Sequence, residues 1–180
     1  MSKAIDDLKH EHEAILSSLE TLDVMVDRAT KGGQLSSDDV RGFIGFLKEF
    51  ADKCHHGKEE GILFPTLVQA GMPERGGPIG VMLTEHTEGR RLIKDMENAA
   101  AGAVVEARFA PAARGYAGLL RAHIQKENNV LFPAADRLLS PHELEEVHGR
   151  FEEHEEKVIG HGRHEELHAL LKELKRKYPA

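Results

Sequence analysis

The sequence predicts an all-α protein, an up-down-up-down four-helix bundle with an additional C-terminal helix. Hydrophobic residues recur at three- and four-residue steps along most of the chain, as on one face of an amphipathic helix. Short segments rich in glycine and proline separate these stripes. Four such helices joined by short loops pack most simply as an antiparallel bundle. Only 5% of the residues are aromatic, so the core should be mainly aliphatic.

The first two helices have recognisable ends. The first apolar stripe occupies residues 5–26 and stops before residues 32–33, a Gly-Gly pair. The second helix is expected to start at residues 36–39 (Ser-Ser-Asp-Asp), because Ser and Asp side chains accept hydrogen bonds from the free N–H groups of a first turn. Its stripe covers residues 43–62, and its tail reaches about residue 71.

The third and fourth helices follow a proline- and glycine-rich loop at residues 72–78. The third stripe covers residues 79–96 and weakens in the Ala- and Gly-rich stretch at residues 99–105. The fourth stripe covers residues 116–131, and we expect the chain to enter this helix near Pro111.

A fifth helix should begin at residues 140–143 (Ser-Pro-His-Glu). Here Ser can cap the helix, Pro suits the first turn and Glu completes a capping box. Gly160 and Gly162 are expected to bend or break this helix, which should pack outside the bundle or across one of its ends. The predicted division is therefore a bundle over residues 1–139 and a C-terminal helical extension over residues 140–180.

The bundle contains an internal duplication. Residues 54–65 align without gaps to residues 122–133 and share the pattern His-x-x-Lys-Glu-x-x-[Ile/Val]-Leu-Phe-Pro. A Glu-His pair precedes each copy, at residues 11–12 and 85–86. Two equivalent halves would place two equivalent ligand sets facing each other. The pseudo-repeats extend over about residues 1–70 and 75–139.

Four histidines and two glutamates are predicted to point into the core of this bundle. A histidine and a glutamate four residues apart lie on one helix face, and all six residues lie within apolar stripes. They are His12, His55, Glu59, His86, His123 and Glu127. Burying six such groups is costly unless they pair with one another or bind a metal.

The second helix offers two registers. His56 and Glu60 form the alternative pair, but they share a polar face, and their counterparts in the second half are an isoleucine and an asparagine. We therefore predict that His55 and Glu59 face the core, with His56 as a supplementary ligand or a supporting group.

Five other residues near the predicted ligands have competing interpretations. Cys54 is expected to be a small buried residue rather than a redox group, and Tyr116 a core residue rather than a donor or radical site. Glu11 and Glu85 should cap helices or face solvent. Arg90 either lies on the surface or pairs with a buried carboxylate.

The C-terminal histidines lack inward carboxylates and are expected to lie on a solvated, charged helix. His164 and His168 are spaced to bind a surface metal, and His161 lies between two glycines that could fold it over the site. The set comprises His142, His148, His154, His161, His164 and His168.

The predicted donor set combines imidazole and carboxylate without thiolate, which favours iron, manganese or zinc over soft metals. Two bridging carboxylates could hold a pair of metals, each with two histidines and two carboxylate oxygens. An octahedral ion would then keep about two positions for an oxo or hydroxo bridge and an exogenous ligand. Dioxygen, peroxide and nitric oxide chemistry requires such open positions between redox-capable ions.

On these residues the chain resembles hemerythrin-like, HHE cation-binding proteins over about residues 1–139. The long C-terminal helix resembles the extension in bacterial members. The resemblance implies a non-heme diiron site in the bundle, with two iron ions and an oxo or hydroxo bridge. It implies that one iron is bound by His12 and His55, the other by His86 and His123, with Glu59 and Glu127 bridging.

The sequence departs from the oxygen-carrying hemerythrins at two places. Those proteins have a second histidine one turn after the third-helix ligand, where this chain has Arg90. They also have an aspartate in the fourth helix, where this chain has Asn128 and Glu127 takes the carboxylate role. The resemblance therefore implies one histidine fewer and a more open or differently filled metal site. This pattern is associated with oxygen or nitric oxide sensing, peroxide handling, iron homeostasis and repair of iron–sulfur centres.

The leading interpretation is a diiron protein that binds dioxygen or a related small oxidant for sensing, storage or buffering. The alternatives are a diiron enzyme acting on peroxide or nitric oxide, and an iron storage or repair protein. No catalytic residue is assigned. A net charge of −7 argues against nucleic-acid binding, and the absence of a Gly-rich phosphate loop disfavours a nucleotide enzyme. No stretch has the roughly 18 apolar residues of a membrane span, and no signal peptide is evident, so a cytoplasmic location is expected.

Overall fold

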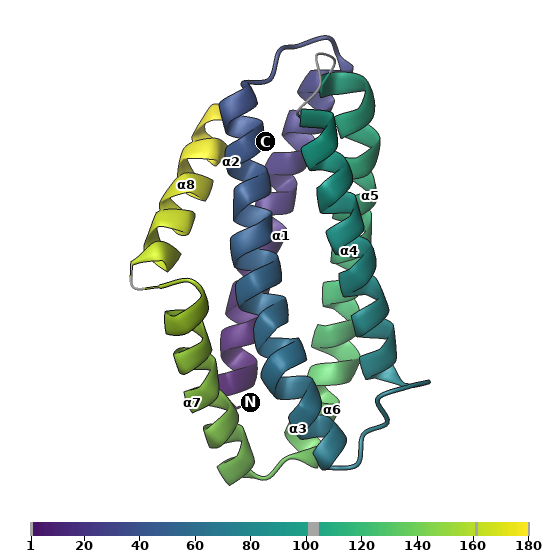
Figure 1. Cartoon of the computed structure of the whole chain (residues 1–180), viewed down its shortest axis with the longest axis vertical. Coiled ribbons are helices and arrows are strands. Elements are labelled where there is room, and N and C mark those ends of the chain that lie inside the picture. The colour runs from purple at the N-terminus through teal and green to yellow at the C-terminus, as the bar shows by residue number, and fades with distance from the viewer. Residues whose placement is uncertain (1, 101–104, 161, 180) are drawn as a thin grey trace.

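The computed structural model describes residues 2–100, 105–160 and 162–179, and it confirms the all-α fold (Figure 1). Four long helical columns run side by side, and two of them contain π-helical turns, labelled η. The first column is α1 (Lys3–Thr30), and the third is α4 (Pro78–Ala100). The second column joins α2 (Ser37–Phe46), η1 (Leu47–His56), η2 (Glu59–Leu63) and α3 (Phe64–Gln69). The fourth column joins α5 (Val105–Lys126), η3 (Glu127–Leu131) and α6 (Phe132–Leu138). Among the described residues, no helix is both long and apolar enough to cross a membrane.

The C-terminal extension consists of α7 (Pro141–Val158) and α8 (Arg163–Lys177), which lie along one side of the four columns (Figure 1). The predicted break is confirmed, because Gly160 and Gly162 have φ angles of +88° and +80°, which other residues rarely adopt. The capping box at Ser140 and Glu143 is also present. The extension packs outside the bundle, with α7 against α1 and the second column, and α8 against α2 and α1.

The start of the fourth column differs from the prediction. α5 begins at Val105, and Pro111 lies inside it rather than at its entrance. A proline within a helix removes one backbone hydrogen bond. Buried neighbours on the same helix, Phe109 and Ala113, pack into the core and outweigh that loss. By contrast, the predicted cap of the second helix is confirmed, since the Ser36 hydroxyl accepts a hydrogen bond from the backbone of the first turn.

The π turns occupy matching places in the duplicated segment. η2 and η3 both begin at the glutamate of the shared pattern and both end just before Phe-Pro. Pro65 and Pro133 have no N–H group, and their rings crowd the carbonyl four residues earlier, so regular α-helical hydrogen bonding cannot run through these positions. The wider turns change the angular spacing of side chains along the column.

The core has two hydrophobic layers with a polar layer between them. One layer is built from residues such as Leu19, Phe43 and Tyr116, and it includes Leu171 of α8. The other surrounds Leu8, Phe64 and Phe132 and includes Phe151 of α7. The extension thus contributes to both layers. The division of the chain at residue 139 stays a prediction.

Candidate metal centre

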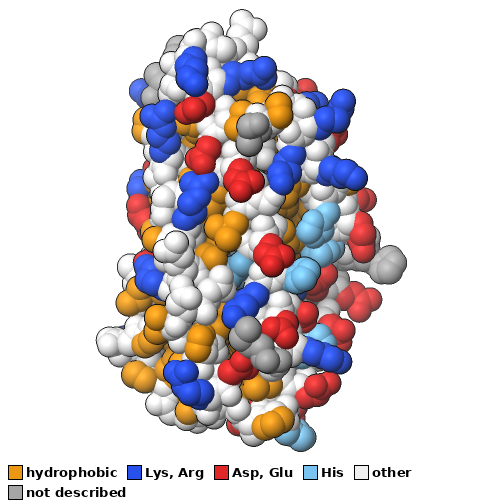
Figure 2. Space-filling view, turned by 180° about the vertical axis from the view of Figure 1, so that it is seen from behind, with side chains coloured by type: hydrophobic (Ala, Val, Ile, Leu, Met, Phe, Trp, Pro, Cys, Tyr) orange, Lys and Arg blue, Asp and Glu red, His pale blue; other side chains and the backbone are white. Residues whose placement is uncertain are grey.

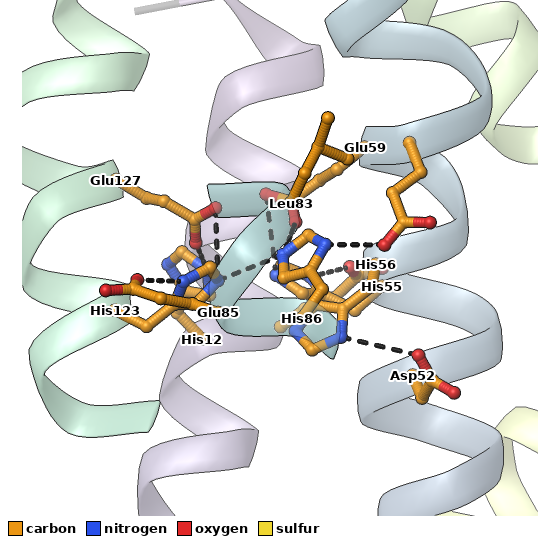
Figure 3. A network of polar contacts seen from close by, with 12 residues as sticks. His12, Asp52, His55, His56, Glu59, Leu83, Glu85, His86, His123 and Glu127 are labelled. Carbon is orange, nitrogen blue, oxygen red and sulfur yellow. Dashed lines mark hydrogen bonds and ion pairs between the residues drawn. The ribbon is translucent and has the colours of Figure 1, made fainter. Parts of the chain in front are cut away.

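The six histidines and glutamates predicted to face the core meet in the polar layer between the two hydrophobic layers (Figure 3). Each is at most 1% exposed. Their donor atoms form two groups, within each of which all donor atoms lie within 4.8 Å of one another. One group is His12, His55, Glu59 and Glu127, and the other is His56, Glu59, His86 and His123. Glu59 belongs to both groups, as a bridging carboxylate would.

His56 joins this cluster together with His55, so the two registers weighed in the sequence are not exclusive. His56 is 3% exposed, and its ring stacks on that of His86 with 3.8 Å between ring centroids. The polar face assigned to His56 assumed an α-helical spacing. Both histidines lie in the π-helical η1, where the wider turn allows two consecutive side chains to reach the bundle interior.

The inward atoms of the cluster lie close together yet are mostly without hydrogen-bond partners. Glu127 approaches the Nε2 atoms of His12 and His123 at 3.1 and 3.2 Å. Glu59 approaches those of His86 and His55 at 3.4 and 3.8 Å. Within the described residues, no carboxylate oxygen of the two glutamates has a hydrogen-bond partner of acceptable geometry. Buried polar atoms are almost always satisfied, so these oxygens fit a bound cation.

The charges of the two buried glutamates lead to the same conclusion. Burial and the charge of Glu127 raise the pKa of Glu59 well above its usual value. Burial also opposes ionisation of Glu127, but the close imidazoles of His12 and His123 hold its pKa well below the usual value. The cluster alone therefore favours one ionised carboxylate, and metal cations would compensate both charges.

Each of four histidines is held from outside by an oxygen atom at its Nδ1. His55 Nδ1 donates to Glu11 at 2.7 Å, and His123 Nδ1 donates to Glu85 at 2.9 Å. His86 Nδ1 donates to Glu60 at 2.7 Å, and His12 Nδ1 donates to Asn128 at 3.0 Å. With the proton on Nδ1, the Nε2 lone pair points into the cluster, as histidine ligands require.

Glu11 and Glu85 therefore do more than cap helices or face solvent, contrary to the sequence expectation. Each also pairs with the lysine of the duplicated pattern, Glu11 with Lys58 at 2.5 Å and Glu85 with Lys126. The repeated Glu-His pair and the lysine shared by both copies were the sequence signal for this support. Periodicity misses it because each glutamate lies on a different helix from the histidine it holds.

The support also crosses between the two halves. Glu60 and Asn128 occupy the same position of the duplicated segment, and each binds a histidine of the opposite half. The phenylalanines of the two Leu-Phe-Pro tails cross in the same way, with Phe64 stacked on His86 and Phe132 stacked on His12.

Arg90 pairs with carboxylates, one of the two roles expected for it. Its guanidinium donates to Asp52 and to Glu60, both at 2.7 Å. Asp52 lies 3.6 Å from His56 Nδ1, and Glu60 accepts from His86. Arg90 thus links the outer partners of two histidines. In the other half the corresponding support is absent from the sequence, since the counterpart of His56 is Ile124.

Burial keeps His55 in the neutral form that binds metal. Burial lowers the pKa of His55 to about 4 although Glu11 opposes the shift. Burial would raise the pKa of Glu11, but the hydrogen bonds and charges of His55 and Lys58 bring it to about 2. A neutral imidazole next to an ionised carboxylate is therefore the resting state at neutral pH.

Cys54 and Tyr116 are both buried, as expected. Burial raises the pKa of the Cys54 thiol to about 12, so the thiol stays protonated. Tyr116 packs in the hydrophobic layer next to the cluster, and its hydroxyl has no hydrogen-bond partner among the described residues.

The described C-terminal histidines lie away from the cluster, and acidic and histidine side chains gather along the edge formed by α7 and α8 (Figure 2). His148 pairs with Asp7, and His164 and His168 pack around Phe50. None of the described members of this set belongs to a group of three or more possible metal ligands. His161 lies outside the described residues.

Comparison with known proteins agrees with this geometry. The family model "Hemerythrin HHE cation binding domain" matches residues 3–135. Proteins called "Iron-sulfur cluster repair protein YtfE" from Enterobacter sp. (strain 638), Salmonella newport (strain SL254) and Salmonella agona (strain SL483) are 31% identical to the chain over 128 residues. These matches cover 64% of this chain and 58% of each relative. No solved structure gives a significant match. With the match covering most of its length, the chain belongs to the hemerythrin HHE cation-binding family.

Proposed function

We propose that this chain binds dioxygen or a related small oxidant at a non-heme diiron centre in the polar layer of the bundle. Membership of the family implies such a centre, and the buried His and Glu groups could hold its ions. When bound, two iron ions supply open coordination positions and electrons for small oxidants.

The residues divide between two metal positions in this proposal. His12 and His55 hold one metal, and His86 and His123 hold the other, with His56 as an additional ligand of the second. Glu59 and Glu127 lie between the positions. The outer carboxylates and Asn128 orient the imidazoles and keep Nε2 unprotonated. The two donor groups have four residues each but differ in kind, with two histidines and two glutamates in one and three histidines and one glutamate in the other.

The burial of the donor residues is the observation that supports a small oxidant as the ligand. All seven donor residues are at most 3% exposed, and hydrophobic layers close the site on both sides. Such a site excludes large substrates and bulk water, but a molecule with two non-hydrogen atoms can enter through small side-chain movements. Dioxygen, peroxide and nitric oxide have this size.

A second candidate function is the repair of iron–sulfur clusters. The names of the relatives at 31% identity describe that role, and the chain covers somewhat over half of their length. In that case the centre would exchange iron or electrons with a damaged cluster on another protein. The donor set is the same, so only a functional assay separates the two candidates.

The proposal is tested by loading the protein with ferrous iron under anaerobic conditions. Metal analysis should give two irons per chain, and exposure to dioxygen should produce a charge-transfer absorption band that reverses when the gas is removed. Glu59→Ala should abolish this band, because Glu59 belongs to both donor groups. Glu153→Gln on the exposed face of α7 is the control and should leave it unchanged.

Other outcomes separate the alternatives. Rapid consumption of added peroxide that Glu59→Ala abolishes would indicate an enzyme instead. Restoration of a damaged iron–sulfur protein by the loaded chain, without a reversible oxygen band, would favour repair. One zinc per chain and no redox-dependent absorption would contradict every diiron function.

A further inference from the structure

We infer that α7 is a clamp that holds the metal-bearing π-helical segment in place, with Glu155 and His154 as its positioning residues. The helix lies outside the residues matched by the family model, which end at 135. Yet it packs directly against η1 and η2, the segment that carries His55, His56 and Glu59. The inference rests on the proposed diiron centre for its effect on metal, but its contacts are independent of that function.

The first contact of the clamp is a chain of charged groups. The Glu155 carboxylate of α7 accepts a hydrogen bond from Lys58 at 2.8 Å, and Lys58 donates to Glu11 at 2.5 Å. The other oxygen of Glu11 accepts from His55 Nδ1 at 2.7 Å. The Lys58 ammonium also lies 5.9 Å from the ring centre of Phe151 on α7. Two residues of α7 thus fix the lysine on which the orientation of Glu11 and His55 depends.

The second contact joins α7 to the backbone of the π-helical segment. His154 Nε2 lies 3.0 Å from the carbonyl oxygen of Lys53, to which it donates. Arg150 reaches the carbonyl of Gly61 at 3.5 Å, the carbonyl that Pro65 cannot bond. π turns and proline leave such carbonyls without their usual α-helical partners, and α7 supplies substitutes.

Gly57 allows this close approach. A Cβ atom at this position would lie 2.7 Å from His154 Nε2, which is too short for any real contact. The helix α7 therefore packs closely against the backbone between His56 and Glu59. Gly57 aligns with Gln125 in the duplicated segment, so the second half has no glycine at the equivalent position.

The comparison of the halves shows that the clamp acts on one side only. Lys126 is the counterpart of Lys58 and pairs with Glu85, but within the described part of the chain no second carboxylate joins it. The Lys126 side chain is 39% exposed, whereas that of Lys58 is 4% exposed. Loss of Glu155 should therefore disturb His55 and the metal position it shares with His12, and leave His123 unaffected.

The one cysteine of the chain offers a readout that needs no metal. Cys54 is fully buried, and its sulfur lies within 4.8 Å of carboxylate oxygens of Glu155 and Glu11. Movement of α7 away from the segment would expose it. In the metal-free protein, Glu155→Gln and His154→Ala should each increase the rate of Cys54 alkylation by N-ethylmaleimide at least about tenfold. Glu153→Gln, an exposed change on the same helix, should not alter the rate.

The effect on metal is measured as iron release to a ferrous chelator. From protein loaded with two irons, Glu155→Gln should release one iron at least about tenfold faster than the wild type, the size expected when a group supporting a ligand is lost. The second iron should leave at the wild-type rate.

Because His154→Ala keeps every carboxylate, the rate of Cys54 alkylation in this variant separates movement of α7 from a change of charge near the thiol.

Wild-type alkylation rates in both variants would overturn the inference, as would equal acceleration of both irons. If the wild type fails to bind two irons, the proposed function fails. The alkylation rates of the metal-free chain then still test whether α7 holds the π-helical segment in place. Faster labelling in both variants supports this role, and unchanged labelling overturns it.

Discussion

At the scale of single residues, the centre is set by which nitrogen of each histidine faces inward. An outer oxygen holds Nδ1 of His12, His55, His86 and His123, and these partners come from different helices. Orientation by such groups commonly changes metal affinity 10- to 100-fold. The supporting carboxylates are therefore as testable as the ligands themselves.

His56 provides the sharpest test of the donor set. His56→Ala should reduce tightly held iron from about two per chain to about one, because the position shared with His86 and His123 loses a donor. His142→Ala, which removes an exposed histidine, should retain both irons. Anaerobic titration followed by desalting and metal analysis measures the difference. Equal iron content in the two variants would remove His56 from the site.

Arg90 should matter for metal more than for stability. Arg90→Ala removes the hydrogen bonds to Asp52 and Glu60, so the affinity for the iron near His86 should fall at least about tenfold. The Arg90 side chain is 41% exposed, and such ion pairs contribute at most about 1 kcal/mol to the free energy of unfolding. Iron titration and thermal denaturation measure the two effects.

Arg91→Ala is the matched control for this prediction. Arg91 follows Arg90 on α4, and in the described part of the chain its ion pairs are with exposed residues of its own helix, Glu88 and Asp95. Its loss should leave iron affinity unchanged. A similar loss of affinity in both variants would point to a general charge effect instead of the specific link to Glu60.

At the scale of elements, the π turns explain why two adjacent histidines share one site. A regular helix separates neighbouring side chains by about 100°, so His55 and His56 would point to different faces. The wider turns of η1 and η2, followed by Phe-Pro, let both reach the interior. The same turns leave carbonyl groups that α7 satisfies.

At Gly57, the sign of the change in the free energy of unfolding tests how closely α7 packs against this residue. Glycine to alanine in a helix normally stabilises a protein by up to about 1 kcal/mol. Gly57→Ala should instead lower the free energy of unfolding, because the added Cβ would displace His154 from Lys53. Gly45→Ala, in α2 with open space around it, should stabilise the protein. Urea denaturation measures both, and stabilisation by Gly57→Ala would contradict the close seating of α7.

At the scale of the whole molecule, the extension is part of the packing. Leu144, Val147 and Phe151 of α7 belong to one hydrophobic layer, and Leu167, Leu171 and Leu174 of α8 belong to the other. We therefore propose that the division at residue 139 separates segments of the sequence rather than independently stable units.

A chain that ends at Leu139 should test this division. Removal of α7 and α8 uncovers apolar faces of α1 and the second column, so the melting temperature should fall sharply or the chain should aggregate. Phe151→Ala in the full chain should cost about 3–5 kcal/mol by the same reasoning. Differential scanning calorimetry measures both. Cooperative unfolding of residues 1–139 at the wild-type temperature would make the bundle a domain of its own.

The sequence determined the four columns, the caps at Ser36 and Ser140, and the six histidines and glutamates that meet in the polar layer. Apolar periodicity and capping residues are local properties, and the duplicated His-x-x-x-Glu pattern places a histidine and a glutamate on one face of each of two helices. The predicted start of the fourth column, near Pro111, is wrong because the packing of Phe109 and Ala113 outweighs the cost of a proline inside the helix.

Only the tertiary structure decided how the donors are supported. His56 required the change of spacing in a π turn, and Glu11, Glu60 and Asn128 act on histidines of other helices. The role of α7 likewise depends on its position against η1, which no sequence pattern records. A sequence specifies which side chains share a helix face, because that depends on local geometry. Contacts between helices depend on how whole elements pack, and they are fixed only when the chain folds.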